Sequence, residues 1–228
     1  MAAGEGTRLR PLTERWAKPV LPVDGRPVIG TLLRELAAAE VERATIVTGH
    51  LAEQVEALVG DGAAFGLAVS FVRQPEPLGS GDAVLRAVRA GARPPLVVTA
   101  ADTVFAAGDL GRFLAETAGA AGALAVRRDP PPSPPHRTAV RIVEGRVERV
   151  LDDDPRNPLG GAPLWLLGPA AARFLDPLPG KPPYELSSIF QLAVDSGETV
   201  AGIEIGPTRD LTAPLDLVKE NFPYLGAT

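Results

Sequence analysis

The chain has no cysteine among its 228 residues, and it has only two histidines, two tyrosines and one methionine. The lack of cysteine excludes a disulfide framework and any chemistry that uses a thiolate. The sequence shows no apolar run of membrane-spanning length, and no signal peptide precedes its glycine-rich start. We therefore expect a cytoplasmic protein without a membrane partner.

Basic residues are also not in excess. The chain has 23 Lys and Arg against 28 Asp and Glu, which gives a formal net charge of −5. A general nucleic-acid-binding protein needs a basic surface to neutralise phosphates, so we expect no nucleic-acid partner. Because the basic residues are scattered along the chain, a local anion site built from a few cations remains compatible with this charge.

The start of the chain, residues 1–13, is rich in glycine and other small residues, and Lys18 follows shortly after it. Gly4 and Gly6 allow backbone N–H groups to surround an anion, because glycine has no Cβ and tolerates positive φ angles. Arg8 adds a planar guanidinium suited to phosphate, and Lys18 adds a mobile point charge. The stretch therefore predicts a loop that binds a polyphosphate.

This loop matches neither of the commonest phosphate-binding motifs. A P-loop requires Gly-Lys-Ser/Thr after its spacer, which the chain lacks, and a dinucleotide fingerprint requires glycine where the chain has Leu9. A bare Gly-x-Gly would indicate only a surface turn. The further presence of Arg8, Pro11, Thr13 and Lys18 at their spacings favours phosphate binding.

Apolar periodicity predicts an α/β fold. Helical spacing is found at 28–40, 51–59, 83–90 and 109–118, and strand-like runs at 44–48, 67–73, 95–102, 122–127 and 199–205. A hairpin is predicted over 138–152, with Glu144-Gly145 as its turn. Strands that alternate with helices favour a mainly parallel sheet covered on both faces. The length fits a single domain, 1–228.

Asp102 stands at the end of the predicted strand 95–102. Ligands of open parallel sheets bind outside the carboxyl ends of the strands, so this carboxylate is expected to face the same crevice as the glycine-rich loop. A carboxylate is a hard oxygen ligand suited to Mg²⁺ that is already held by triphosphate oxygens. The alternative is an acid that caps the following turn or the helix at Asp109.

The motif Gly4-x-Gly6-Thr7-Arg8-Leu9-x-Pro11-Leu12-Thr13, with Lys18-Pro19-x-Leu21 after it, resembles the signature of the sugar-1-phosphate nucleotidylyltransferases. The resemblance implies Mg²⁺-dependent transfer of a nucleotidyl group from an NTP to a sugar 1-phosphate, with release of pyrophosphate. It implies UTP or dTTP and a phosphorylated sugar as partners, and it leaves a homo-oligomer open.

The same resemblance implies a Rossmann-like three-layer α/β/α fold with a mainly parallel mixed sheet. The first strand of that sheet is expected to be truncated, because only Met1 to Ala3 precede Gly4. The nucleotide-binding half would be 1–128 and the acceptor-binding half 129–228.

Site residues follow from the resemblance position by position. Arg8 and Lys18 would be catalytic, as cations that neutralise the leaving pyrophosphate, and Asp102 and Asp210 would be the metal ligands. The nucleotide would be bound by Ala3, Gly4, Gly6, Thr7, Gln74, Gly79 and Ser80. The acceptor would be bound by Gly161 and Glu185.

Some of these residues also have plainer explanations. Ser80 or Asp82 would cap the helix that follows them, Glu185 would be a first-turn helix acid, and Asp210 a loop acid. Thr212 is expected to be the N-cap of a C-terminal helix. His50, just beyond a strand, is expected only to hydrogen-bond within a loop.

The chain departs from the family pattern at Asp154. Family members carry a lysine there, after the hairpin, which holds the sugar phosphate, and Arg156 is the nearest substitute donor. This departure leaves open a cytidylyltransferase that acts on a non-sugar phosphate such as phosphocholine, or a non-catalytic nucleotide- or sugar-sensing relative. The proline-rich segment 129–136 is expected to be a stiff surface loop.

Overall fold

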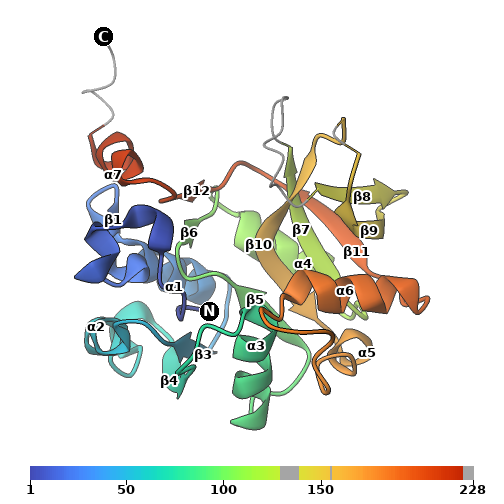
Figure 1. Ribbon diagram of the computed structural model, residues 1–228, viewed down its shortest axis with the longest axis horizontal. Helices are drawn as coiled ribbons and strands as arrows, with labels where there is room; N and C mark the ends of the chain where they lie inside the picture. Colours follow the sequence, from blue (N-terminus) through green and yellow to red (C-terminus); the bar gives the residue numbers. More distant parts are fainter. Residues whose placement is uncertain (129–138, 155, 223–228) are drawn as a thin grey trace. The chain divides into compact units, whose positions relative to one another are not determined.

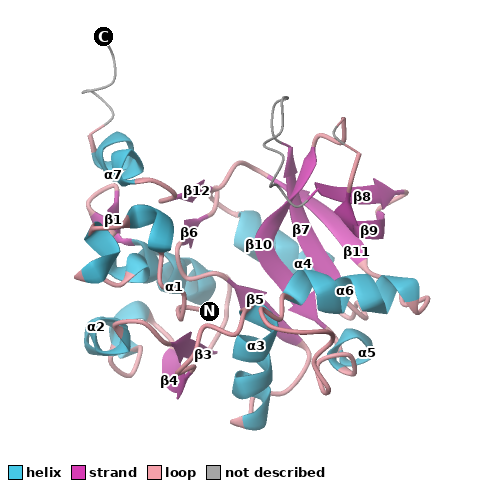
Figure 2. Cartoon of the chain, viewed as in Figure 1, coloured by secondary structure: helices cyan, strands magenta, loops and turns pink. Residues whose placement is uncertain are grey.

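The computed structural model describes residues 1–128, 139–154 and 156–222 (Figures 1 and 2). The chain forms two compact units. Unit 1 comprises Met1–Pro77, Ala100–Phe105 and Arg209–Thr228, and unit 2 comprises Leu78–Thr99 and Ala106–Thr208. Contacts between residues define these units, and they do not test how many domains the chain has. The single domain, with its nucleotide-binding half 1–128 and its acceptor-binding half 129–228, therefore remains a prediction. The proline-rich segment 129–136 lies outside the described residues.

The strands of unit 1 begin with a parallel pair. Strand β3 (Arg43–Thr48) runs alongside β4 (Ala68–Arg73), with Arg43 opposite Ala68 and Thr48 opposite Arg73. The expected first strand is represented by an isolated parallel bridge between Ala2 and Thr48. The Ala2 N–H donates to the Val47 carbonyl at 2.7 Å, and the Ala101 N–H donates to the Met1 carbonyl at 2.8 Å. The residues just before the glycine-rich loop are therefore held in a strand-like position.

Helix α1 (Val28–Ala38) buries Ile29, Leu32, Leu33 and Leu36, as its apolar spacing predicts. Unit 1 also contains α2 (Ala52–Val59), α7 (Pro214–Asn221) and the short strands β1 (Pro22–Val23), β2 (Arg26–Pro27), β6 (Thr103–Val104) and β12 (Arg209–Asp210). Its 3-10 turns are η1 (Thr7–Leu9), η2 (Leu12–Glu14), η3 (Lys18–Val20) and η4 (Ala63–Phe65).

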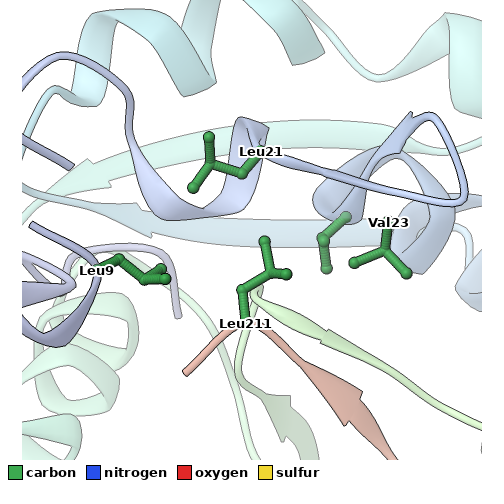
Figure 3. Close-up of a cluster of buried hydrophobic side chains, with 5 residues drawn as sticks. Leu9, Leu21, Val23 and Leu211 are labelled. Carbon is green, nitrogen blue, oxygen red and sulfur yellow. The ribbon is translucent and has the colours of Figure 1, made fainter. Parts of the chain in front are cut away.

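A cluster of buried side chains joins segments of unit 1 that are far apart in the sequence. Leu9, Leu21, Val23, Val28 and Leu211 pack together, and Figure 3 shows the first three and Leu211 converging from separate segments. Leu9 lies in the glycine-rich loop, and Leu211 directly follows β12. The cluster, named here the Leu9–Leu211 core, therefore fixes the loop and β12 to one packed centre.

Unit 2 contains a six-stranded mixed sheet in the order β5-β10-β7-β11-β9-β8. The strands are β5 (Leu96–Thr99), β7 (Ala123–Arg128), β8 (Ala139–Val143), β9 (Arg146–Asp152), β10 (Leu159–Leu167) and β11 (Ala201–Ile205). Within this described sheet the β7–β11 pair is parallel, whereas β10 runs antiparallel to both β5 and β7. The expected mainly parallel pairing does not hold here, because no described helix separates β7, the β8–β9 hairpin and β10.

The helices of unit 2 are α3 (Ser80–Arg89), α4 (Asp109–Glu116), α5 (Pro169–Ala172) and α6 (Leu186–Asp195), and α6 contacts β9 and α5. The hairpin turn lies at Glu144 and Gly145, as predicted, and both residues have positive φ angles, 49° and 75°. The α/β class is thus confirmed, and the three-layer arrangement remains a prediction. Among the described residues, no helix combines the length and apolarity needed to cross a bilayer.

The Leu9–Leu211 core makes a prediction about stability. Leu211→Ala removes a side chain that is 1% exposed and leaves a cavity, so we expect unfolding to require about 2–5 kcal/mol less free energy. Leu215→Ala is the matched control, because Leu215 is 58% exposed and should change stability by no more than about 0.5 kcal/mol. Urea unfolding of both variants measures the difference, and equal losses would contradict the packing described.

Candidate active site

The glycine-rich loop of unit 1 adopts a conformation that requires glycine at one of its two glycine positions. Gly6 has φ 62° and ψ 37°, which is the left-handed region, and a Cβ there would lie 2.9 Å from Cγ2 of Thr13. Gly4 instead faces open space, since a Cβ there would meet no described atom within 4 Å. The loop is therefore packed on the Gly6 side and unobstructed at Gly4, as a backbone cradle for an anion requires.

Polar side chains fix this loop from behind. The hydroxyl of Thr13, a residue that is 1% exposed, donates to the Gly6 carbonyl at 2.8 Å. Nε2 of His50 donates to the Thr13 carbonyl at 2.6 Å. These two hydrogen bonds therefore fix the glycine-rich loop to the connection between β3 and α2. His50 makes the loop hydrogen bond expected of it, whereas the part played by Thr13 was not foreseen.

Gln54 of α2 holds the segment that leads to Lys18. Its side-chain amide N–H donates to the Arg15 carbonyl at 2.7 Å, and its side-chain oxygen accepts from the Ala17 N–H at 2.8 Å. Both backbone contacts come from one side chain, so the residue before Lys18 has a defined position. Sequence reasoning missed Gln54, because a glutamine within a helix carries no signal of such a contact.

Arg8 lies in η1 with its side chain exposed. It makes no hydrogen bond or ion pair with any described residue, whereas its neighbour Arg10 pairs with Glu5 at 3.2 Å. Thr7, before it, is exposed as well. Arg8 therefore presents its guanidinium to solvent beside the loop, where an anion can reach it.

Lys18 and Asp102 form an ion pair. Their side chains are 14% and 28% exposed, so both charges are partly withdrawn from water. Lys18 comes from η3. Asp102 lies in the turn before β6 rather than at the end of a strand, because β5 ends at Thr99. Two residues that the sequence assigns to one site thus meet directly.

Asp210 lies next to this pair in the strand register. In the antiparallel pairing of β12 with β6, Asp210 is opposite Thr103, which directly follows Asp102. The Thr212 hydroxyl donates to the Asp210 carboxylate at 2.9 Å. Thr212 therefore does not cap α7 as predicted: the N-cap is Ala213, and the threonine side chain supports Asp210 instead.

The first turn of α7 adds a third carboxylate to this region. Asp216 accepts the backbone N–H groups of Ala213 and Thr212 at 2.7 and 2.9 Å. The Ala213 N–H is the main cause that lowers the pKa of the Asp216 carboxyl, and the charges of Lys219 and Lys18 also contribute. Lys18 is therefore within electrostatic reach of Asp216 as well as bonded to Asp102.

The donor set near Lys18 suits a metal that arrives with phosphate. Among the described residues, no group of three or more His, Cys, Asp or Glu side chains is placed to hold a metal ion. Asp102 and Asp210 come from paired strands and offer hard carboxylate oxygens. Mg²⁺ is commonly bound by one or two carboxylates together with substrate phosphates and water, so these two residues fit it.

In unit 2 the predicted residues Gly79, Ser80 and Glu185 come together. Gly79 has φ 101°, and a Cβ there would lie 2.4 Å from the Tyr184 carbonyl oxygen. The Ser80 hydroxyl donates to Glu185 at 2.5 Å and accepts the Leu186 N–H at 2.8 Å. The prediction that Ser80 or Asp82 caps α3 is wrong, because the N-cap is Gly79. Ser80 instead satisfies the start of α6.

Gln74 is buried and Gly161 is partly buried. Gln74 of unit 1 follows β4, is 5% exposed and donates its backbone N–H to Thr48 at 2.7 Å. Gly161 of unit 2 lies in β10 opposite Val126, where the register with β7 shifts. The roles of both residues in binding remain predictions.

The acid at the family's lysine position has a cationic partner nearby. Asp154 accepts the backbone N–H of Arg156 at 2.9 Å and the guanidinium Nε at 3.3 Å. The Arg156 backbone N–H, followed by its side chain, lowers the pKa of the Asp154 carboxyl. The substitute donor and the unexpected acid therefore pair with each other.

Comparisons with known proteins identify the family. The sequence profile described as nucleotidyl transferase matches residues 1–135. Glucose-1-phosphate thymidylyltransferase of Streptomyces griseus is 45% identical over 85 residues, which are 37% of this chain and 24% of that protein. The bifunctional protein GlmU of Paracidovorax citrulli is 31% identical over 96% of this chain and 48% of its own length. The chain thus spans about a quarter to a half of these relatives.

Solved structures share the fold at lower identity. A UTP-bound UGPase from Acinetobacter baumannii has a TM-score of 0.81 at 21% identity, covering 98% of this chain and 90% of that one. The inositol-1-phosphate CTP transferase from T. maritima has a TM-score of 0.78 at 18% identity, covering 94% and 88%. Because the profile covers more than half of the sequence, the chain belongs to the nucleotidyl transferase family.

Proposed function

We propose that the protein transfers a nucleotidyl group from an NTP to a sugar 1-phosphate and releases pyrophosphate. The observation that carries the proposal is the ion pair of Lys18 with Asp102 in unit 1, which also holds the anchored glycine-rich loop and Asp210 opposite Thr103. Relatives named as glucose-1-phosphate thymidylyltransferase and mannose-1-phosphate guanylyltransferase support the reaction class.

In this reaction a phosphate oxygen of the acceptor attacks the α-phosphorus of the NTP. The bond from the α-phosphorus to the bridging oxygen breaks, and pyrophosphate leaves with the electron pair. The attacking oxygen is already ionised at neutral pH, so no general base is needed. The protein contributes positioning and charge neutralisation, which suits a site without cysteine or a catalytic histidine.

The residues take the following parts. The backbone from Gly4 to Thr7 would bind the triphosphate, and Arg8 and Lys18 would neutralise charge on the leaving pyrophosphate. Asp102 and Asp210 would hold Mg²⁺, which supplies a Lewis acid at the phosphoryl oxygens when bound. Ser80 and Glu185, which contact each other, would bind the nucleotide and the acceptor sugar.

For the nucleotide we propose UTP or dTTP, and for the acceptor a sugar 1-phosphate rather than a cationic alcohol phosphate. Acids such as Asp154 would favour a cationic acceptor only if their charge were available. The Asp154 carboxylate is instead paired with Arg156, which weakens that reason. Pyrophosphate release measured with each NTP, Mg²⁺ and a panel of sugar 1-phosphates, inositol 1-phosphate and phosphocholine tests the proposal.

Release that depends on one sugar 1-phosphate supports the proposed reaction. Release with phosphocholine or inositol 1-phosphate alone would replace it with the alcohol-phosphate alternative. Tight nucleotide binding without release for any acceptor would identify a non-catalytic sensor.

The exposed guanidinium of Arg8 gives the first prediction about activity. Arg8→Ala should lower kcat by about 10²–10³, because it removes one electrostatic contact that forms on the departing phosphates. Arg10→Ala is the matched control, since Arg10 makes an exposed ion pair with Glu5 in the same loop. An Arg8→Ala protein that retained full pyrophosphate exchange would remove Arg8 from the mechanism.

The hydrogen bond from His50 gives a second prediction. In His50→Gln the side-chain N–H can replace Nε2 as donor to Thr13, whereas in His50→Asn the side chain is too short. We expect His50→Asn to raise KM for the NTP about fivefold to tenfold, the loss that one hydrogen bond implies, and His50→Gln to restore most of it. Equal KM values in the two variants would show that the loop does not depend on this contact.

The contact between Ser80 and Glu185 gives a third prediction. Ser80→Ala and Glu185→Ala should each raise KM for the acceptor, and the double variant should lose less than the product of the single effects, because each substitution removes the same hydrogen bond. A double-mutant cycle on acceptor KM measures this coupling. Fully multiplicative effects would mean that the two residues act separately.

A further inference from the structure

Lys18 and Asp102 are assigned to different ligands, yet they are bonded to each other. The lysine is expected to contact phosphate and the aspartate to contact the metal. In the structure the Lys18 ammonium lies on Oδ2 of Asp102, with both side chains mostly shielded from water. Two partly desolvated charges that neutralise each other in this way are both unavailable to an incoming ligand.

The neighbouring groups reinforce this arrangement. Asp210 on the paired strand has its carboxylate engaged by the Thr212 hydroxyl, and Asp216 accepts two backbone N–H groups. Lys18 is bonded to the Asp102 carboxylate, and the buried ammonium of Met1 is also within electrostatic reach of that carboxylate. A triphosphate on the loop would offer Lys18 a more highly charged partner.

We propose that Lys18 takes the place of the metal on Asp102 in the nucleotide-free protein and transfers to the triphosphate when the NTP binds. Asp102 is then released to Mg²⁺ in the same step. The exchange rests on the proposed function and deepens it, because it makes nucleotide and metal each favour the binding of the other. The free protein is kept from binding metal tightly without its nucleotide.

A permanent ion pair would behave differently. If Lys18 and Asp102 stayed together with ligands bound, removal of either residue would weaken the site for both ligands. If they exchange, removal of each partner frees the other for its own ligand. The two arrangements therefore predict opposite signs for the change in affinity.

The metal side is tested with Mn²⁺ and no nucleotide, by electron paramagnetic resonance of free Mn²⁺. Lys18→Met should bind Mn²⁺ about fivefold more tightly than the natural chain, which is the share that such an ion pair contributes. Lys219→Met is the matched control, because Lys219 is an exposed lysine near Asp216, and it should change the affinity less than twofold. Unchanged or weaker Mn²⁺ binding by Lys18→Met would overturn the exchange.

The phosphate side is tested with UTP in EDTA, by calorimetry. Asp102→Asn should bind metal-free UTP about fivefold more tightly, because Lys18 no longer has to leave a carboxylate. Glu53→Gln removes one exposed acid of the same unit and should have little effect. Weaker UTP binding by Asp102→Asn than by the control would show a permanent pair instead.

Neither measurement requires turnover, so the outcomes separate the two proposals. A protein that forms no nucleotide sugar and still shows both affinity gains retains the exchange and loses the proposed reaction. A protein that is active and shows neither gain retains the reaction and loses the exchange. Melting temperatures identify a variant that fails to fold. If Lys18→Met or Asp102→Asn does so, the affinity change of the other variant tests the exchange.

Discussion

The buried cluster that joins Leu9 and Leu211 is the feature on which the rest of unit 1 depends. Leu9 comes from the glycine-rich loop and Leu211 from the residue after β12, and both are almost fully buried in one cluster. Burial of these side chains stabilises the region by the hydrophobic effect. It also holds β12, which contains Asp210 and ends just before Leu211, beside its partner strand β6. A binding loop and a carboxylate far apart in sequence are therefore placed by apolar contacts.

Hydrogen bonds then set the finer position of the loop. Apolar packing has little directional preference, whereas the bonds from Thr13, His50 and Gln54 each fix a particular backbone group. All three are made to main-chain atoms, so the loop keeps its conformation while Arg8 remains exposed. Such preorganisation lowers the cost of ordering the loop when an anion binds.

The local sequence pattern predicted the helices and strands well. It failed where a side chain could bond to another partner than the one expected from its neighbours. The helical spacing of Leu32 and Leu36 and the turn at Glu144 depend on neighbours in sequence, so they could be predicted. Thr212 and Ser80 were predicted to be N-caps of the helices that follow them. Thr212 instead bonds to Asp210, and Ser80 bonds to the start of α6. The mainly parallel pairing failed because strand order within the unit 2 sheet depends on distant segments. The catalytic and metal-binding roles of Lys18 and Asp102 were inferred from a motif and remain predictions, and the ion pair between the two residues could not be predicted from it.

Several charged side chains assigned to the candidate site have a partner before any ligand is present. Lys18 is bonded to Asp102 and Arg156 to Asp154, and the Glu185 carboxylate accepts the Ser80 hydroxyl. A ligand must replace these contacts, so its net gain is the difference between new and existing interactions. Arg8 differs because it has no described partner, and its full charge is available to a first anion. In the proposed mechanism, capture of a phosphate at Arg8 would therefore cost the least, and the paired groups would rearrange afterwards.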